Sequence, residues 1–138
     1  MTGWRDEQGT APTELALLTP VLMLFVLFVV FVGRLATAQL DVTAAARDAA
    51  RAASLRAQPA DATADARITA TRALADRGVT CHALTVTVDI SDLQPGGTIH
   101  VTVACDTDLA DLAILRVPGS HRVSATATEV IDRYGIQS

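Results

Sequence analysis

The side chains of this sequence that could take part in the most kinds of chemistry are its two cysteines and three histidines. Cys81 and Cys105 flank a predicted hairpin, and His82, His100 and His121 lie in or near it. Thiols that meet across paired strands can form a disulfide, and thiols with imidazoles can ligate a soft metal ion. No C-x-x-C or H-x-x-x-H spacing is present. Outside the cytoplasm we therefore expect a Cys81–Cys105 disulfide, with a metal site or free thiols as the alternatives.

Catalytic motifs are missing from the sequence. The segment around Ser120 lacks a G-x-S-x-G elbow, and no glycine-rich phosphate loop joins a strand to a helix. The acids Asp106, Asp108 and Asp111 are more typical of solvated or capping positions than of a catalytic or calcium site. A net charge of -4 over 138 residues argues against nucleic-acid binding. We expect no enzyme, no cofactor, no metal and no small-molecule substrate.

One acid directly precedes a long apolar run. Glu14 follows Gly9 by five positions and opens Leu15–Val32, a run of 18 residues without a charge. As a helix this run would extend roughly 27 Å, close to the thickness of a bilayer hydrocarbon core. Thr19 and Pro20 interrupt it only in its first turns, where proline is most easily accommodated. The sequence therefore predicts insertion into a membrane.

The inserted segment has two possible fates. A cleaved secretory signal would use Ala36-Thr37-Ala38 as its site, but the apolar run is too long for one and Arg34 precedes the site. A retained N-terminal anchor avoids both difficulties, and we expect this fate. Arginine counts alone would place the C-terminal part inside, because Arg5 is the only basic side chain before the run. The expected disulfide favours the opposite orientation, with the C-terminal part outside the cytoplasm.

After the apolar run the chain is rich in alanine, a strong helix former, and no proline interrupts it until Pro59. We expect one long helix from Ala11 to about Ala57. One side of it carries a small-residue stripe that permits close packing on its own sheet or on neighbouring subunits. The stripe consists of Leu35, Ala38, Val42, Ala45, Ala46, Ala49 and Ala53.

The C-terminal part alternates between helical and period-two patterns. A second helix is predicted from an Asp61 cap through Asp76, closed by Arg77-Gly78. Strands are predicted over 84–90, 99–103 and 122–128, and the turn-rich segment between the first two makes them a hairpin. The connector 106–120 is unusually apolar. It is either a short helix from an Asp108 cap that covers the open face of the sheet or a docking surface.

These patterns predict an α+β fold. A long N-terminal membrane-spanning helix continues into a stalk, and a small head follows with one helix and an antiparallel three-stranded sheet. The expected divisions are residues 1–9 as a leader, 10–57 as transmembrane helix and stalk, and 58–138 as an extracytoplasmic head.

The spacing of Gly9 and Glu14 before the apolar helix resembles the processing signal of type IV pilins. The segment from Pro12 to Ser54 resembles the N-terminal half of TadE-like pseudopilins of Tad (tight adherence) Flp-pilus systems. The tail "VPGSHRVSATATEVIDRY" is similar to the end of the actinobacterial branch of that family. Thr10 as first mature residue, Pro12 and a leader with a single arginine depart from the usual pattern.

The resemblance implies a minor pilin or pseudopilin of a Tad/Flp-type pilus. Its partners would be a prepilin peptidase that cuts between Gly9 and Thr10, other pilins and pseudopilins, and the membrane assembly platform. It would be a single-pass protein of the cytoplasmic membrane with its head outside, and it could enter an extracellular pilus. Glu14 would act in assembly by pairing with the amino group that cleavage frees. The alternative is an uncleaved single-pass envelope protein whose head binds a ligand and which joins no fibre.

Overall fold

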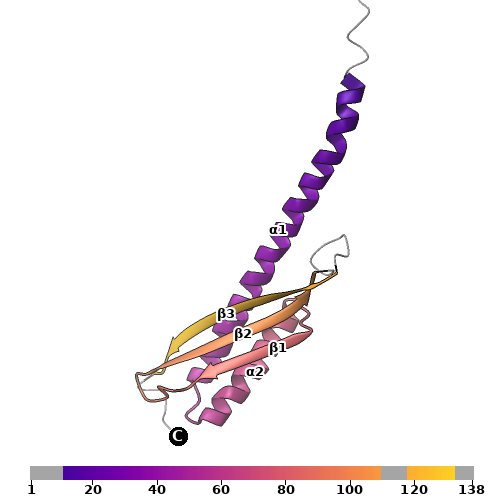
Figure 1. The fold of residues 1–138 in the computed structure, drawn as a ribbon. Coiled ribbons are helices and arrows are strands. Elements are labelled where there is room, and N and C mark those ends of the chain that lie inside the picture. The colour runs from indigo at the N-terminus through magenta and orange to yellow at the C-terminus, as the bar shows by residue number, and fades with distance from the viewer. Residues whose placement is uncertain (1–10, 110–117, 133–138) are drawn as a thin grey trace, which may run out of the picture. The chain divides into compact units, whose positions relative to one another are not determined.

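A computed structural model describes residues 11–109 and 118–132 of the chain. The elements, in order, are α1 (Ala11–Ser54), α2 (Pro59–Asp76), β1 (Ala83–Asp89), β2 (Thr98–Asp108) and β3 (Ser120–Val130) (Figure 1). The expected α+β class is confirmed, with a long apolar N-terminal helix, a second helix and a three-stranded antiparallel sheet.

The chain divides into two compact units, Met1–Arg34 and Leu35–Ser138. The described part of the first unit is the N-terminal half of α1. The second unit contains the rest of α1, α2 and the whole sheet. The expected boundary after Ala57, between stalk and head, stays a prediction. The two compact units divide at another place, after Arg34, so the stretch Leu35–Ser54 belongs to the second unit.

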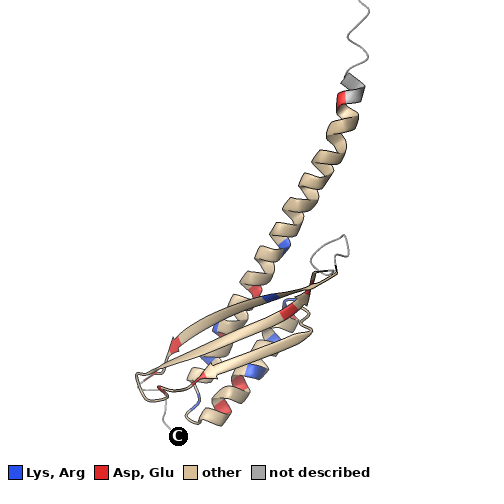
Figure 2. Cartoon of the chain, viewed as in Figure 1, with Lys and Arg blue, Asp and Glu red and all other residues tan. Residues whose placement is uncertain are grey.

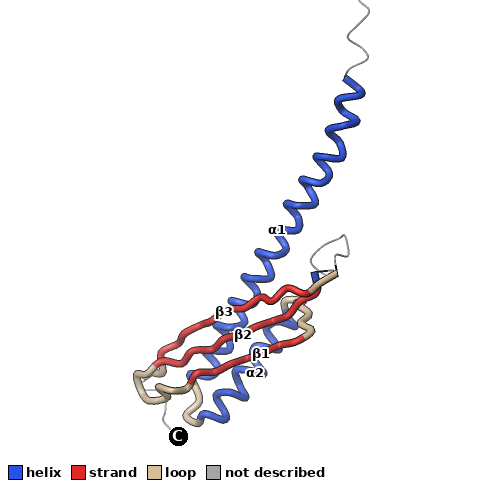
Figure 3. Tube along the Cα trace, viewed as in Figure 1, coloured by secondary structure: helices blue, strands red, loops and turns tan. Residues whose placement is uncertain are grey.

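The sheet of the second unit has the strand order β1-β2-β3, and both pairs are antiparallel. Val101 at its centre lies opposite Val88 on one side and Ala127 on the other. Alternate residues of β2 are buried, as period-two patterning predicts, and the side chains between them are partly or fully exposed. Figures 1 and 3 show both helices of this unit on one side of the sheet.

The core lies between the helices and that side of the sheet, and alanine dominates its helical half. The strands supply larger side chains, among them Ile99, Val101, Val103 and Val123. The buried helical residues are Ala38, Val42, Ala45, Ala46, Ala49, Ala50 and Ala53 on α1, and Ala62, Ala66, Ala70, Ala73 and Leu74 on α2.

The start of α2 differs from the sequence expectation. The predicted cap was Asp61, but the N-cap is Gln58, and Asp61 lies in the first turn. Pro59 explains the earlier start, because proline has no N–H to lose and its fixed φ suits the first helical position. The end of α2 agrees with the prediction: Gly78 adopts a φ of 70° and donates its N–H to the Ala75 carbonyl at 3.0 Å.

The loop between β1 and β2 is held by Asp92. One of its carboxylate oxygens accepts a hydrogen bond from the backbone N–H of Thr98 at 3.3 Å, and the other accepts one from the side chain of Gln94. A Cβ at Gly97 would lie 2.1 Å from the backbone oxygen of Asp92. Gly97 is therefore required for this turn to close.

The predicted connector 106–120 is shorter than expected. Asp106–Asp108 form the end of β2 and Ser120 begins β3, so both strands extend beyond their predicted ends. Asp108 is the last residue of β2, and Leu109, which follows it, is helical. The rest of the segment for which a covering helix or a docking surface is predicted, residues 110–117, lies outside the described residues, so both stay predictions.

Candidate membrane anchor and disulfide-bonded head

The N-terminal half of α1 has the properties of a membrane anchor. It is the one helix in the described part of the chain that is long and apolar enough to cross a membrane. Its large side chains are exposed on every side; Leu17, for example, is 72% exposed and Phe25 63%. A helix that is apolar all round and has no protein neighbours suits lipid, which contacts every face equally. Between Glu14 and Arg34 the helix has no charged residue, and Figure 2 shows this stretch in tan.

Two polar interruptions near the start of this stretch are accommodated within the helix. The hydroxyl of Thr19 donates a hydrogen bond to the Leu15 carbonyl at 2.7 Å, so no free hydroxyl faces lipid. Pro20 lies inside α1 and removes one backbone donor. Both residues lie near the helix start, where water and lipid headgroups can hydrogen-bond polar groups that have no partner within the helix.

Glu14 is exposed and is the acidic residue of the first turn of α1. The N-terminus of a helix carries a partial positive charge, so an acid there is favourable. Gly9 and Thr10, the predicted processing residues, lie outside the described residues.

Two polar contacts tie the C-terminal half of α1 to the rest of the second unit, and a third joins the loop after α1 to α2. Gln39 donates from Nε2 to the backbone carbonyl of Ser124 at 3.0 Å. Arg77 contacts Asp48 at 3.3 Å, and Arg56 forms an ion pair with Asp65 on α2. Sequence reasoning missed Gln39. Its position beside the buried stripe at Ala38 and Val42 is the one signal that could have suggested a contact with the sheet.

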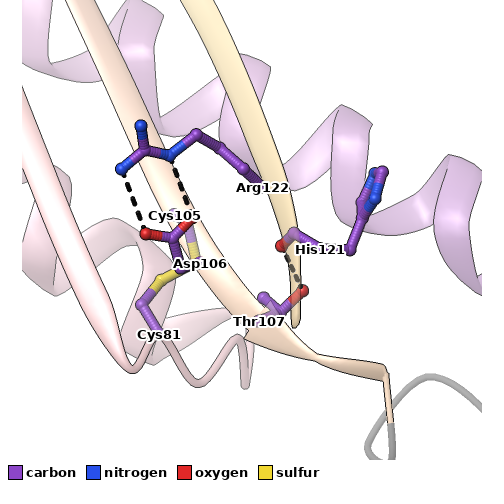
Figure 4. Close-up of polar contacts among 6 residues, drawn as sticks. All are labelled: Cys81, Cys105, Asp106, Thr107, His121 and Arg122. Atoms are coloured by element: carbon purple, nitrogen blue, oxygen red, sulfur yellow. Dashed lines mark hydrogen bonds and ion pairs between the residues drawn. A yellow bond between two sulfur atoms is a disulfide. The ribbon is translucent and has the colours of Figure 1, made fainter. Parts of the chain in front are cut away.

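Cys81 and Cys105 are joined in a disulfide, and their Cα atoms are 5.3 Å apart (Figure 4). Cys105 lies on β2 with a fully buried side chain, and Cys81 lies in the segment that leads into β1. The bond spans 24 positions and encloses β1 and the hairpin loop. It therefore fastens the start of an edge strand to the central strand.

Polar groups surround the disulfide at this end of the sheet. Arg122 on β3 donates to both carboxylate oxygens of Asp106 on β2, at 2.9 and 3.1 Å (Figure 4). These hydrogen bonds with Asp106 raise the pKa of the Arg122 guanidinium above its ordinary value. The buried hydroxyl of Thr107 donates to the His121 carbonyl at 3.3 Å. The Asp106–Arg122 pair follows from the strand register, which the sequence did not specify.

Neither cysteine is a free thiol. His82 contacts Asp108 at 2.6 Å and His100 contacts the Thr128 hydroxyl at 2.7 Å. Among residues 11–109 and 118–132, no three histidine, cysteine or acidic side chains form a group that could hold a metal ion. Because both cysteine sulfur atoms are in the disulfide, neither is available as a thiolate ligand for the metal site considered as an alternative.

A comparison with known protein families finds a match in the N-terminal part of the chain. The family model for TadE-like protein matches residues 9–51, from the predicted cleavage position to the part of α1 that enters the head core. The chain therefore carries a TadE-like domain. No curated protein and no solved structure matches the chain significantly.

The TadE-like domain contains the apolar stretch of α1 and three predicted functional residues, Gly9, Thr10 and Glu14. The match and the apolar helix support a membrane-anchored subunit associated with the Tad pilus. TadE-like pilus proteins are structural proteins that associate with pilus assembly components. The match ends at Arg51, so α2 and the sheet lie beyond it.

Proposed function

We propose that this TadE-like chain is a minor pilin or pseudopilin that a prepilin peptidase matures by cutting after Gly9. The observation that carries the proposal is the position of the family match, which begins at Gly9 and includes the anchor. The cut would release residues 1–9 and leave Thr10 as the new N-terminus. The function is structural: the anchor holds the subunit in the cytoplasmic membrane until the assembly platform and other pilins engage it.

The head would lie outside the cytoplasm. Support for this orientation comes from the disulfide, because such bonds persist in oxidising compartments and are rare in the cytosol. Retention of the anchor is supported by the burial of Ala38, since a secretory cut after that residue would divide α1.

Cleavage is tested by intact mass. The full chain is expressed in membranes with and without a co-expressed prepilin peptidase. The mass should fall by that of Met1–Gly9 only when the peptidase is present. Gly9→Leu should block the change, because a branched side chain prevents the close backbone approach that glycine allows. Gly3→Leu, at the other leader glycine, is the matched control and should be cut normally. A mature N-terminus at Gln39 would instead establish the secretory-signal alternative.

Glu14 would serve assembly by binding a charge that exists only after the cut. Cleavage frees the α-amino group of Thr10, whose ordinary pKa is about 8, so it is mostly cationic at neutral pH. An acid within a membrane helix costs free energy, although less near the helix end than at the bilayer centre. An ion pair with its own amino terminus or that of a neighbouring subunit would offset this cost.

The assembly role is tested with Glu14→Val. This variant should insert and be cut like the parent but should no longer co-purify with the major pilin. Glu14→Asp keeps the charge and should retain most of the co-purification. If Glu14→Val co-purifies like the parent, Glu14 has no role in assembly, whatever the outcome of the cleavage test.

The alternative function, an uncleaved envelope protein with a ligand-binding head, shares the anchor and the disulfide. It predicts an unchanged mass in the presence of the peptidase and no association with pilins. The two functions are therefore separated by the same cleavage and co-purification measurements.

A further inference from the structure

The sheet of the second unit has helices on one side only (Figures 1 and 3). Side chains on the opposite side, which we name the open face, are exposed or partly exposed on all three strands. Hydroxyl groups dominate this face, and the side chain at its centre is the small one of Ala104. The open face consists of Thr85, Thr87, Asp89, His100, Thr102, Ala104, Ser124, Thr126 and Thr128.

Asp89 is the acidic residue of the open face. It is exposed at the end of β1, beside His100 on β2. One of its carboxylate oxygens accepts a hydrogen bond from the backbone N–H of Ser91, but Asp89 forms no ion pair with another residue of the described part of the chain. This face therefore presents a negative charge without a cationic partner.

The C-terminal half of α1 presents the opposite charge on the side that points away from the sheet. Leu40, Ala44, Arg47 and Arg51 recur there at intervals of four, three and four, and we name them the outer face of α1. Leu40 is 69% exposed. Both arginines are exposed, and neither forms an ion pair with another described residue. Like charges four residues apart destabilise a helix slightly, so an acidic partner would relieve this cost.

The two faces match in direction and in spacing. Figure 1 shows this half of α1 running in the same general direction as β1 and β3. If Leu40 of one copy lies over Ala104 of another, Arg47 lies about 10.5 Å and Arg51 about 16.5 Å further along the helix. Asp89 pairs with His100, four residues from Ala104 on β2, and so lies about 13 Å along the strands in that direction. The acid therefore falls between the two arginines.

We propose that the outer face of α1 binds the open face of the sheet in a second copy of this chain, with Leu40 over Ala104 and with Arg47 and Arg51 on the two sides of Asp89. Burial of Leu40 supplies apolar attraction, and the arginine–aspartate pairs fix the register. Exposed ion pairs are individually weak, so this is a contact between copies already concentrated on one membrane.

The contact joins two different surfaces, so each copy keeps one of each kind free for a further copy. Such heterologous contacts build open arrays or rings and not closed pairs. Copies related in this way all point in the same direction, which lets every anchor enter the same membrane. The contact extends the proposed assembly function but does not require the cut after Gly9, so it is tested in uncleaved chains.

Cross-linking between two differently tagged full-length chains gives a direct test. One carries Leu40→Cys and the other Thr85→Cys, because Thr85 lies directly opposite Ala104 in the sheet and is further than Ala104 from the native disulfide. The two chains are co-expressed without a prepilin peptidase, and the membranes are treated with a short bismaleimide. A mixed dimer should form. A single chain with both cysteines should give a ladder of larger species.

Leu55→Cys is the matched control for the helix cysteine. Leu55 is as exposed as Leu40 but lies about 20 Å further along the chain direction of α1, beyond its last residue. With the Thr85→Cys chain it should give several-fold less mixed dimer. Equal yields from Leu40→Cys and Leu55→Cys, products that stop at the dimer in the chain with both cysteines, or cross-links to a different protein alone would overturn the proposal.

Charge reversal tests the register. Arg47→Asp and Arg51→Asp together, in the chain with the helix cysteine, should lower the mixed-dimer yield roughly fivefold, because attraction to Asp89 becomes repulsion. Asp89→Arg in the other chain should then restore the yield. Reversal of Arg67 and Arg72, exposed arginines on α2, changes the net charge equally and should have little effect. Circular dichroism checks that each chain folds. An equal loss from the α2 reversals, or no loss from the α1 reversals, would contradict the contact.

Discussion

Gln39 on α1 and Ser124 on β3, 85 positions apart in the chain, are joined by a hydrogen bond of 3.0 Å from the side-chain Nε2 to the backbone carbonyl. β3 is an edge strand, and its outward carbonyl groups would otherwise depend on water. The helix that continues from the anchor therefore protects the edge of the sheet. The stretch Leu35–Ser54 thus packs within the second compact unit.

The first prediction concerns truncation. A chain that begins at Leu35 should fold as a cooperative unit, because it keeps every residue of the second compact unit. A chain that begins at Gln58 should not, because it lacks Val42 and the buried alanines of α1, which leaves only α2 to cover that side of the sheet. Thermal unfolding followed by circular dichroism measures both. A sharp unfolding transition for the shorter chain would show that α1 is dispensable for the fold.

The second prediction concerns the buried alanines of α1. Ala49→Leu should lower the free energy of unfolding by about 1–3 kcal/mol, because a fully buried alanine leaves no room for a larger side chain. Ala36→Leu makes the same change at an exposed position of the same helix and should alter stability by no more than about 0.5 kcal/mol. Urea unfolding of the Leu35–Ser138 chain gives both values. Equal effects at the two sites would mean that α1 does not pack closely on the sheet.

The third prediction concerns the disulfide. Replacing Cys81 and Cys105 together by alanine should lower the free energy of unfolding by about 3–4 kcal/mol, the chain-entropy estimate for a loop of this length. Reduction of the native protein with a thiol should have a similar effect and should not change the double variant further. Mass spectrometry of a non-reduced tryptic digest should show the single peptide Gly78–Arg116, which contains both cysteines, lighter by two hydrogens than its reduced form. Two freely alkylated thiols in protein isolated from membranes would contradict both the bond and the proposed compartment.

The fourth prediction concerns acid sensitivity at the end of β1. The backbone N–H of Ser91 donates to Asp89 at 3.0 Å and, with the Ser91 hydroxyl and the nearby His100, lowers the pKa of Asp89 in the folded chain. A lowered folded pKa stabilises the protein above the unfolded value, about 3.9, and this contribution is lost as the pH falls through the folded pKa. The difference in melting temperature between the parent and Asp89→Asn should therefore be largest near neutral pH and should shrink below about pH 4. A difference that grows with acid would contradict the prediction.

Much of the fold follows from patterns in the sequence. The apolar run predicts the anchor, the period-two segments predict the three strands, and "SDLQPGGT" predicts the turn between the first two. The small-residue stripe of α1 also predicts its buried side, from Ala38 to Ala53. These features depend on local spacing, which a single sequence displays directly.

Features that depend on register or on neighbours could not be predicted in this way. Asp106 faces Arg122 because of the way β2 pairs with β3, and no local pattern specifies that pairing. In the sequence nothing distinguishes Gln39 from other polar residues of the helix, because its partner Ser124 is 85 positions away. Asp61 was a reasonable cap by type, but Pro59 starts the helix earlier.

The alanine layer has a thermodynamic consequence. Unfolding the Leu35–Ser138 chain would expose many methyl groups but few large apolar side chains from the helices. Because the heat capacity of unfolding rises with the apolar area exposed, this chain should have a small heat-capacity change for its length. Its stability would then vary little across a broad range of temperature. Such a shallow dependence would keep the subunit folded over a wide range of growth temperatures.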